Sequence, residues 1–137
     1  MISYNLNNKL LLLFKILFIY FFFFIKSFAI ENDKLKDITE GNENAKIEIL
    51  VYESLSCSHC AAFHKEVYPD LKKDFIDKGL VKIEFKNFPL DMAALNASKI
   101  AHCKNDGKSD ILHFLYHTQN TWIKGQTIDE INLNLKT

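Results

Sequence analysis

The stretch that decides the fold is residues 46–63, which read KIEILVYESLSCSHCAAF. Its first part, residues 46–52, begins with alternating apolar residues and ends with consecutive ones, which is typical of a strand that enters a buried sheet. After a short loop, the motif Cys57-Ser58-His59-Cys60 opens the next segment. Two thiols separated by two residues at the start of a helix can cycle between dithiol and disulfide. The helix N-terminus, together with a cationic His59, favours the thiolate of Cys57.

The residues that follow the motif predict a helix and a second strand. Apolar residues recur every three or four positions over residues 58–78 and form a stripe, which comprises Ala62, Phe63, Val67, Leu71, Phe75 and Ile76. Pro69 is expected to kink this helix, and Gly79 to end it. Residues 81–85 then alternate as a strand. Residues 46–90 therefore predict a βαβ unit with two parallel strands, and the cysteines lie where α/β folds place their chemistry.

Residues 91–137 predict helices only. Asp91 can cap a helix that extends through His102, Ser109 can cap another, and Thr127 begins a capping-box sequence that predicts a third. Residues 30–45 are charged and rich in asparagine, and we expect them to form a flexible, solvated lead-in before the first strand. The exported part is thus expected to be one small α/β domain with a partial helical addition.

The N-terminal segment has the pattern of a secretory signal peptide. Residues 10–25 contain one charged residue in sixteen, Lys9 precedes them, and Ser27-Phe28-Ala29 places small residues where a signal peptidase requires them. We expect residues 1–29 to be a signal peptide cleaved after Ala29. The alternative is an uncleaved membrane anchor, because the apolar run approaches the lower limit for spanning a bilayer. Either way the rest is exported, which in a bacterium means an oxidising periplasm.

The charge distribution excludes one class of function. The chain has 17 basic and 17 acidic residues, and all the basic ones are lysines. Three of these lysines, and no acidic residue, lie within residues 1–29, so the exported part is slightly acidic. Without basic clusters or arginines, the sequence gives no support to nucleic-acid binding.

The cysteines and histidines also allow metal-site interpretations, which we do not favour. A zinc site built on Cys57 and Cys60 needs two further ligands, and no second pair is spaced to supply them. His113 and His117 lie one helical turn apart and could pair on a metal, but we expect a solvated or half-buried helix face. Cys103 is expected to be a small buried hydrophobic residue, with a resolving role in oxidation as the alternative. We expect no metal and no cofactor.

The surroundings of the motif resemble a known family. Residues 52–64, YESLSCSHCAAFH, followed by residues 85–91, FKNFPLD, resemble the DsbA-like branch of the thioredoxin superfamily. The resemblance covers about residues 40–135. It implies a periplasmic thiol:disulfide oxidoreductase that donates its disulfide to unfolded exported proteins and is reoxidised by a membrane partner. It also implies that Cys57 is the attacking thiol, that Cys60 is the buried resolving thiol, and that His59 stabilises the Cys57 thiolate.

The sequence departs from this family at three points. Ser58 stands where proline is common in the strongest oxidants. Val51 stands where family members often bury an acidic residue, although Glu53 has the same strand parity and could substitute for it. The family's cis-proline strand has no counterpart, because Pro69 lies within the helix and Pro89 follows the second strand.

The third departure leads to an expectation about the extent of the fold. We expect the C-terminal ββα half to be missing, which leaves a thioredoxin-like βαβ half and the start of the helical insertion. The leading hypothesis is an oxidoreductase truncated after this half. The alternatives are an inactive fragment that does not fold stably and a membrane-anchored interaction module without catalysis.

Overall fold

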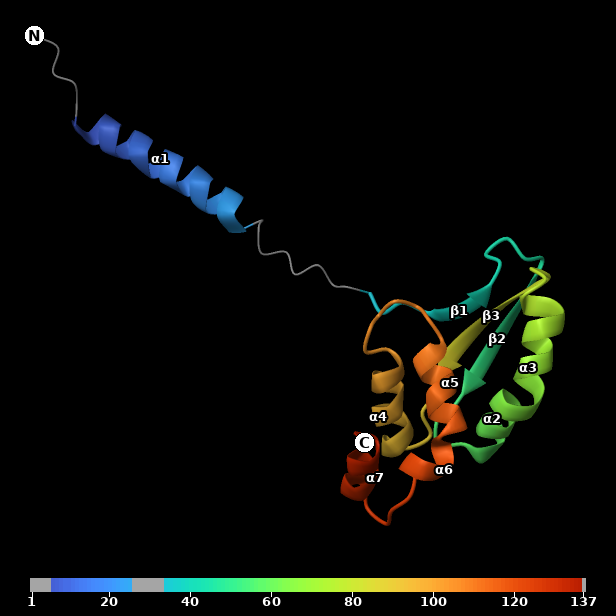
Figure 1. Ribbon diagram of the computed structural model, residues 1–137. Helices are drawn as coiled ribbons and strands as arrows, with labels where there is room; N and C mark the ends of the chain where they lie inside the picture. Colours follow the sequence, from blue (N-terminus) through green and yellow to red (C-terminus); the bar gives the residue numbers. More distant parts are fainter. Residues whose placement is uncertain (1–5, 26–33, 137) are drawn as a thin grey trace, which may run out of the picture. The chain divides into compact units, whose positions relative to one another are not determined.

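The computed structural model describes residues 6–25 and 34–136, which form two separate units (Figure 1). The first unit is the helix α1, Leu6–Ile25. Within the described residues, we find no helix that combines the length and the apolarity needed to cross a bilayer. The predicted cleavage site after Ala29 lies outside the described residues, so the signal peptide stays a prediction.

The second unit contains a three-stranded sheet in the order β1-β3-β2. β2 (Ile47–Glu53) and β3 (Val81–Asn87) are parallel, as the sequence predicts. β1 (Ile38–Gly41) pairs antiparallel with β3, and the buried Ile38 lies opposite Phe85. The prediction that residues 30–45 are only a flexible lead-in is therefore wrong at β1. A strand of four residues with one buried side chain has too little alternation to be recognised in a polar segment.

The core lies on one face of this sheet. Along β3, the side chains of Val81, Ile83 and Phe85 are buried. The other face differs from the sequence-based expectation, because Leu50 is 49% and Tyr52 is 67% exposed. The consecutive apolar residues at the end of β2 predicted a strand buried on both faces of the sheet. Among the described residues, however, the sheet face that carries Leu50 and Tyr52 is exposed.

One continuous helical segment follows the cysteine motif and carries the chain back to β3. It consists of α2 (Ser58–Ala62), η2 (Phe63–Val67), α3 (Tyr68–Leu71) and η3 (Lys72–Ile76), and the two η segments have the wider π-helical geometry. Pro69 lies in the first turn of α3, where its missing N–H is tolerated. The turn before Pro69 has the wider π-helical geometry, in which the Tyr68 N–H bonds to the carbonyl of Phe63, five residues earlier. Gly79 follows with a φ of +72°, as expected of a C-terminal glycine.

The buried face of this helical segment matches the predicted stripe only in part, since Phe63, Leu71 and Ile76 pack in the core but Val67 and Phe75 do not. Val67 is 54% and Phe75 is 48% exposed, whereas Ala61, His64 and Tyr68 are buried. The π turns shift the angular position of later residues, so a 3.6-residue period does not follow the face. Ile76 of the predicted stripe is buried as expected, but two of the segment's four buried residues, His64 and Tyr68, are polar or amphipathic, and a count of apolar residues leaves them out.

Four helices complete the unit: α4 (Met92–Ala101), α5 (Asp110–His117), α6 (Gln119–Trp122) and α7 (Ile128–Asn134). Asp91 and Thr127 cap α4 and α7 as predicted, since their side chains accept N–H bonds from Ala94 and Glu130. Ser109 precedes α5, but its hydroxyl bonds Glu40 instead of the helix. In Figure 1, β2 leads into the loop before α2, and α5 and α6 lie beside this loop.

Candidate active site

The two cysteines of the motif lie at the junction between the carboxyl end of β2 and the helix. Cys57 is the N-cap residue of α2, and its Sγ accepts the backbone N–H of Cys60 at 3.3 Å. The Cys57 N–H donates to the carbonyl of Ser54 at 3.0 Å, which closes the loop. Both cysteines are free thiols and are partly buried. The sequence therefore places this pair where a helix start can stabilise a thiolate.

The surroundings shift the pKa values of the two thiols in opposite directions. The pKa of Cys57 is lowered, first because the Cys60 thiol donates to its sulfur and then because the backbone N–H groups of Cys60 and His59 do so. Burial raises the pKa of Cys60 to about 11, and the hydrogen bond with Cys57 adds to this effect. The pair thus consists of one stabilised thiolate and one thiol that holds its proton.

His59 is exposed between the two cysteines. The contact through which it stabilises the Cys57 thiolate in this structure is its backbone N–H. The predicted contribution of its imidazole ring stays a prediction.

Gln119 is a residue of this site that the sequence did not indicate. It is buried at the start of α6, and its side-chain amide donates to the carbonyls of Leu55 and Cys57 at 2.8 and 2.9 Å. Nothing in the local pattern distinguishes it from a surface glutamine. It fixes the backbone on the N-terminal side of the motif from a helix more than sixty residues away in the chain.

Glu53 is the buried acidic residue near the two thiols. It is 3% exposed at the end of β2, and its Oε2 contacts His64 Nε2 at 2.7 Å. Within normal hydrogen-bond limits, its Oε1 has no partner in the described part of the chain. The negative charge of Glu53 raises the pKa of both Cys57 and Cys60, although other causes are larger. The hypothesis that Glu53 takes the place of the acid missing at Val51 is consistent with this arrangement.

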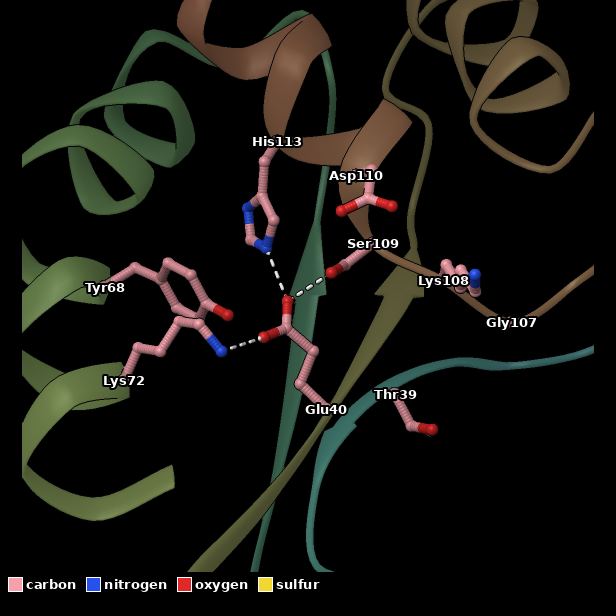
Figure 2. A pocket seen from close by; sticks show the side chains of 9 residues that line it. All are labelled: Thr39, Glu40, Tyr68, Lys72, Gly107, Lys108, Ser109, Asp110 and His113. Atoms are coloured by element: carbon pink, nitrogen blue, oxygen red, sulfur yellow. Dashed lines mark hydrogen bonds and ion pairs between the residues drawn. The ribbon is translucent and has the colours of Figure 1, made fainter. Parts of the chain in front are cut away.

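A line of hydrogen bonds continues from Glu53 to a pocket further along the helical segment, which Tyr68 and Lys72 line. His64 is fully buried, and its Nδ1 contacts His113 Nδ1 at 2.9 Å. His113 Nε2 contacts Glu40 Oε1 at 2.8 Å, and Lys72 Nζ donates to Glu40 Oε2 at 2.8 Å. Figure 2 shows Glu40 at the centre of this pocket, with the side chains of His113, Ser109 and Lys72 pointing toward it.

The carboxylate of Glu40 is held in its charged form. Burial by itself would raise its pKa, but hydrogen bonds from His113, Lys72 and Ser109 outweigh burial and hold the pKa well below its usual range. Burial, and then the neighbouring carboxylate of Glu40, raise the pKa of Tyr68, which lines the same pocket. The sequence did not point to Glu40 or His64, because single polar residues in these segments carry no periodic signal.

The structure separates the remaining candidate residues. Cys103 is exposed in a turn after α4, so the prediction that it is buried is wrong. The prediction assumed that the helix continues from Ile100 to Cys103, whereas α4 ends at Ala101. His113 is half-buried and His117 is exposed, and His117 Nδ1 donates to the carbonyl of His113. In the residues covered by the structure, no group of three or more histidines, cysteines or acids is placed to hold a metal ion.

Comparison with known proteins gives a consistent set of relatives. A family model described as Thioredoxin matches residues 33–136. A candidate protein-disulfide oxidoreductase of Rickettsia bellii is 33% identical over 88 residues, which are 63% of this chain and 34% of the relative. The chain thus spans about a third of the length of the curated relatives it matches.

Two solved structures with related names share the fold. The crystal structure of Wolbachia pipientis α-DsbA1 matches with a TM-score of 0.64 and 29% identity, over 79% of this chain and 53% of that one. Oxidised BdbD from Bacillus subtilis matches with a TM-score of 0.54 and 26% identity, over 66% and 49% of the two chains. The matched part of the Wolbachia structure is therefore about half of that chain.

Proposed function

Since the chain belongs to the thioredoxin family, we propose that it is a thiol:disulfide oxidoreductase that forms disulfide bonds in exported proteins through Cys57 and Cys60. The observation that carries this proposal is the position of Cys57 as the N-cap of α2, where its sulfur accepts the Cys60 N–H, with the more deeply placed Cys60 one turn further along. A stabilised Cys57 thiolate is a good leaving group, and it makes the reduced form favourable, so that the disulfide is oxidising. The names of the relatives support the same reaction class.

The proposed reaction proceeds in two exchanges. A substrate thiolate attacks the Cys57 sulfur of the Cys57–Cys60 disulfide; a substrate–Cys57 disulfide forms, and Cys60 leaves as a thiolate that takes up a proton. A second substrate thiolate then attacks the substrate sulfur of this mixed disulfide, and Cys57 leaves as a thiolate. The substrate loses two electrons to the protein, and the protein ends as a Cys57 thiolate and a Cys60 thiol.

The test is the oxidation of a reduced two-cysteine peptide by the oxidised full chain. The wild type is expected to accelerate peptide disulfide formation above the uncatalysed rate. C57S and C60S are both expected to abolish this activity, because neither variant can form the Cys57–Cys60 disulfide that takes up the two electrons. C103S is the matched control, because Cys103 is exposed outside the motif, and it is expected to retain the wild-type rate. An activity that persists in C57S would contradict the assignment.

The proposed compartment is the periplasm, with residues 1–29 removed and a membrane protein reoxidising the Cys57–Cys60 pair. The support is the apolar segment at residues 10–25 and the small residues before position 30. N-terminal sequencing of the chain expressed in a Gram-negative host is expected to begin at Ile30, in the fraction released by osmotic shock. An intact N-terminus in the membrane fraction would show that the segment is an anchor instead.

A further inference from the structure

The two histidines that separate Glu53 from Glu40 are not used in the reaction above. His64 is fully buried, and Tyr116 stacks on its ring with a centroid distance of 4.0 Å. His113 lies against the ring of Tyr68 at 4.4 Å, and its side chain is 19% exposed. His64 is therefore sealed inside the core, while His113 reaches the pocket beside Glu40.

The hydrogen bonds determine how many protons Glu53, His64 and His113 hold together. Glu40 is a carboxylate that accepts from three donors, so His113 Nε2 carries a hydrogen. The His113–His64 contact joins two Nδ1 atoms and needs one hydrogen between them. The His64–Glu53 contact also needs one. All contacts are satisfied together only when Glu53, His64 and His113 carry no net charge among them.

Three arrangements meet this condition, and they differ only in the positions of two hydrogens, the one between Glu53 and His64 and the one between the two rings. With the acid proton on Glu53, both histidines are neutral. With that proton on His64, Glu53 is a carboxylate and His64 is cationic. When the hydrogen between the rings also moves, the charge lies on His113. A proton therefore passes between Glu53 and His113 without breaking a contact.

One end of this path lies close enough to the thiols for the charge of Glu53 to raise their pKa, and the other end reaches solvent. The Cys60 sulfur accepts the backbone N–H of Ser54, the residue directly after Glu53, and Glu53 has one oxygen without a hydrogen-bond partner among the described residues. At the other end, His113 lines an open pocket of about 330 Å³ together with Glu40, Tyr68 and Lys72 (Figure 2).

We propose that Glu53, His64 and His113 form a proton relay between Cys60 and the Glu40 pocket, which removes the Cys60 proton when this thiol attacks a mixed disulfide on Cys57. The inference rests on the proposed function. In the step concerned, Cys60 gives its proton to the relay, its thiolate attacks the Cys57 sulfur, and the Cys57–Cys60 disulfide forms. The bond to the leaving thiol breaks, that thiolate takes a proton from solvent, and the relay releases one through His113.

The ionisable groups around the relay are consistent with this direction. Cys57 and Cys60 face Glu53 from α2, Tyr116 faces His64 from α5, and Tyr68 faces His113 from α3. Glu40 on β1 and Lys72 on η3 close the outer end. The pKa of Tyr116 is raised by burial and by the charge of Glu53, so its hydroxyl stays neutral and does not compete for the proton.

The experiment separates the two steps by which oxidised glutathione oxidises the reduced full chain. Acid quenching and mass spectrometry follow the glutathione adduct on Cys57 and its conversion to the Cys57–Cys60 disulfide. H113A is expected to form the adduct at the wild-type rate and to convert it at least about tenfold more slowly, since a positioned proton acceptor contributes a factor of this size or more. Imidazole in the buffer is expected to enter the open pocket and restore the conversion.

The matched control is H117A, because His117 lies one turn further along α5 and is exposed. It is expected to convert the adduct at the wild-type rate. Slow conversion in H113A that imidazole does not restore would indicate a structural role and overturn the relay, as would a wild-type conversion rate in H113A. A wild-type chain that forms no disulfide from the adduct would overturn the proposed function itself, and the relay with it.

Discussion

Cys57 and Cys60 are one helical turn apart, yet their sulfurs meet different surroundings. The Cys57 sulfur accepts backbone N–H groups at the start of α2 and is only lightly buried, so its thiolate is stabilised. The Cys60 sulfur lies further inside, and burial disfavours its charged form. Because Glu53 adds a negative charge near both, it works against either thiolate. The difference between the two thiol pKa values therefore arises from nearby groups, and the charge of Glu53 shifts both values.

E53Q is expected to lower the pKa of both thiols, because it removes a charge that raises them. The measurement is the pH dependence of thiolate absorbance and of alkylation at Cys57, and the Cys57 profile is expected to move to lower pH. E48Q is the matched control, since Glu48 lies on the same strand but pairs with Lys82 on the exposed surface. A Cys57 profile that stays in place in E53Q would show that Glu53 does not act on the thiols.

Among the elements, β1 is a short strand that is anchored mainly by the contacts of its side chains. It contributes four residues to the sheet, and Glu40 ties it to η3 through Lys72 and to α5 through His113 and Ser109. Removing the charge of a partly buried carboxylate that accepts hydrogen bonds from three donors lowers the stability of the fold, because the donors lose a charged acceptor. We therefore expect Glu40 to contribute more to stability than the surface ion pairs of the same region.

E40Q is expected to lower the free energy of unfolding by about 1–3 kcal/mol at neutral pH, because the remaining donors lose a charged acceptor. The pKa of Glu40 is lowered from 4.5, so its contribution is present above about pH 4.5 and is lost as the pH falls. Urea unfolding at several pH values is expected to show that the difference in unfolding free energy between the wild type and E40Q decreases as the pH falls. E43Q is the control, since Glu43 is 71% exposed in its pair with Lys82; an equal loss in both variants would contradict the argument.

The elements also show what the sequence could and could not indicate. Alternation along Val81–Phe85 and the caps at Asp91 and Thr127 depend on neighbouring residues, and the structure confirms them. β1 depends on a partner more than forty residues away, so its own four residues carry little signal. In the same way, His64 became part of the candidate site only through its contacts with Glu53 and His113, which are distant in the sequence.

In the unit of residues 35–136, the helices after β3 complete a site that begins on the strands. Gln119 on α6 holds the carbonyls of Leu55 and Cys57, and His113 on α5 contacts His64 next to the motif. The cysteine pair is therefore supported by both halves of the unit. Its redox state should in turn be coupled to the stability of the fold, because a thiolate stabilised only in the folded chain contributes to folding.

This coupling predicts a pH-dependent difference in stability between the reduced and oxidised forms. The pKa of Cys57 is lowered from 9.0, so it stabilises the reduced fold increasingly as the pH rises from the folded pKa toward 9. The pKa of Cys60 is raised to about 11, so its contribution is fully present below about pH 9 and is lost only above that pH. Between the folded Cys57 pKa and pH 9, Cys57 alone therefore sets the slope.

The measurement is thermal unfolding of both redox forms of the full chain across this pH range. The oxidised form has neither thiol of the motif and serves as the control for every other titrating group. The melting temperature of the reduced form is expected to rise relative to that of the oxidised form as the pH increases, and C57S is expected to remove the slope. A constant difference between the two forms would contradict the lowered Cys57 pKa. The same free energy must appear in the equilibrium with glutathione, because a disulfide that destabilises the folded chain is by that amount more oxidising.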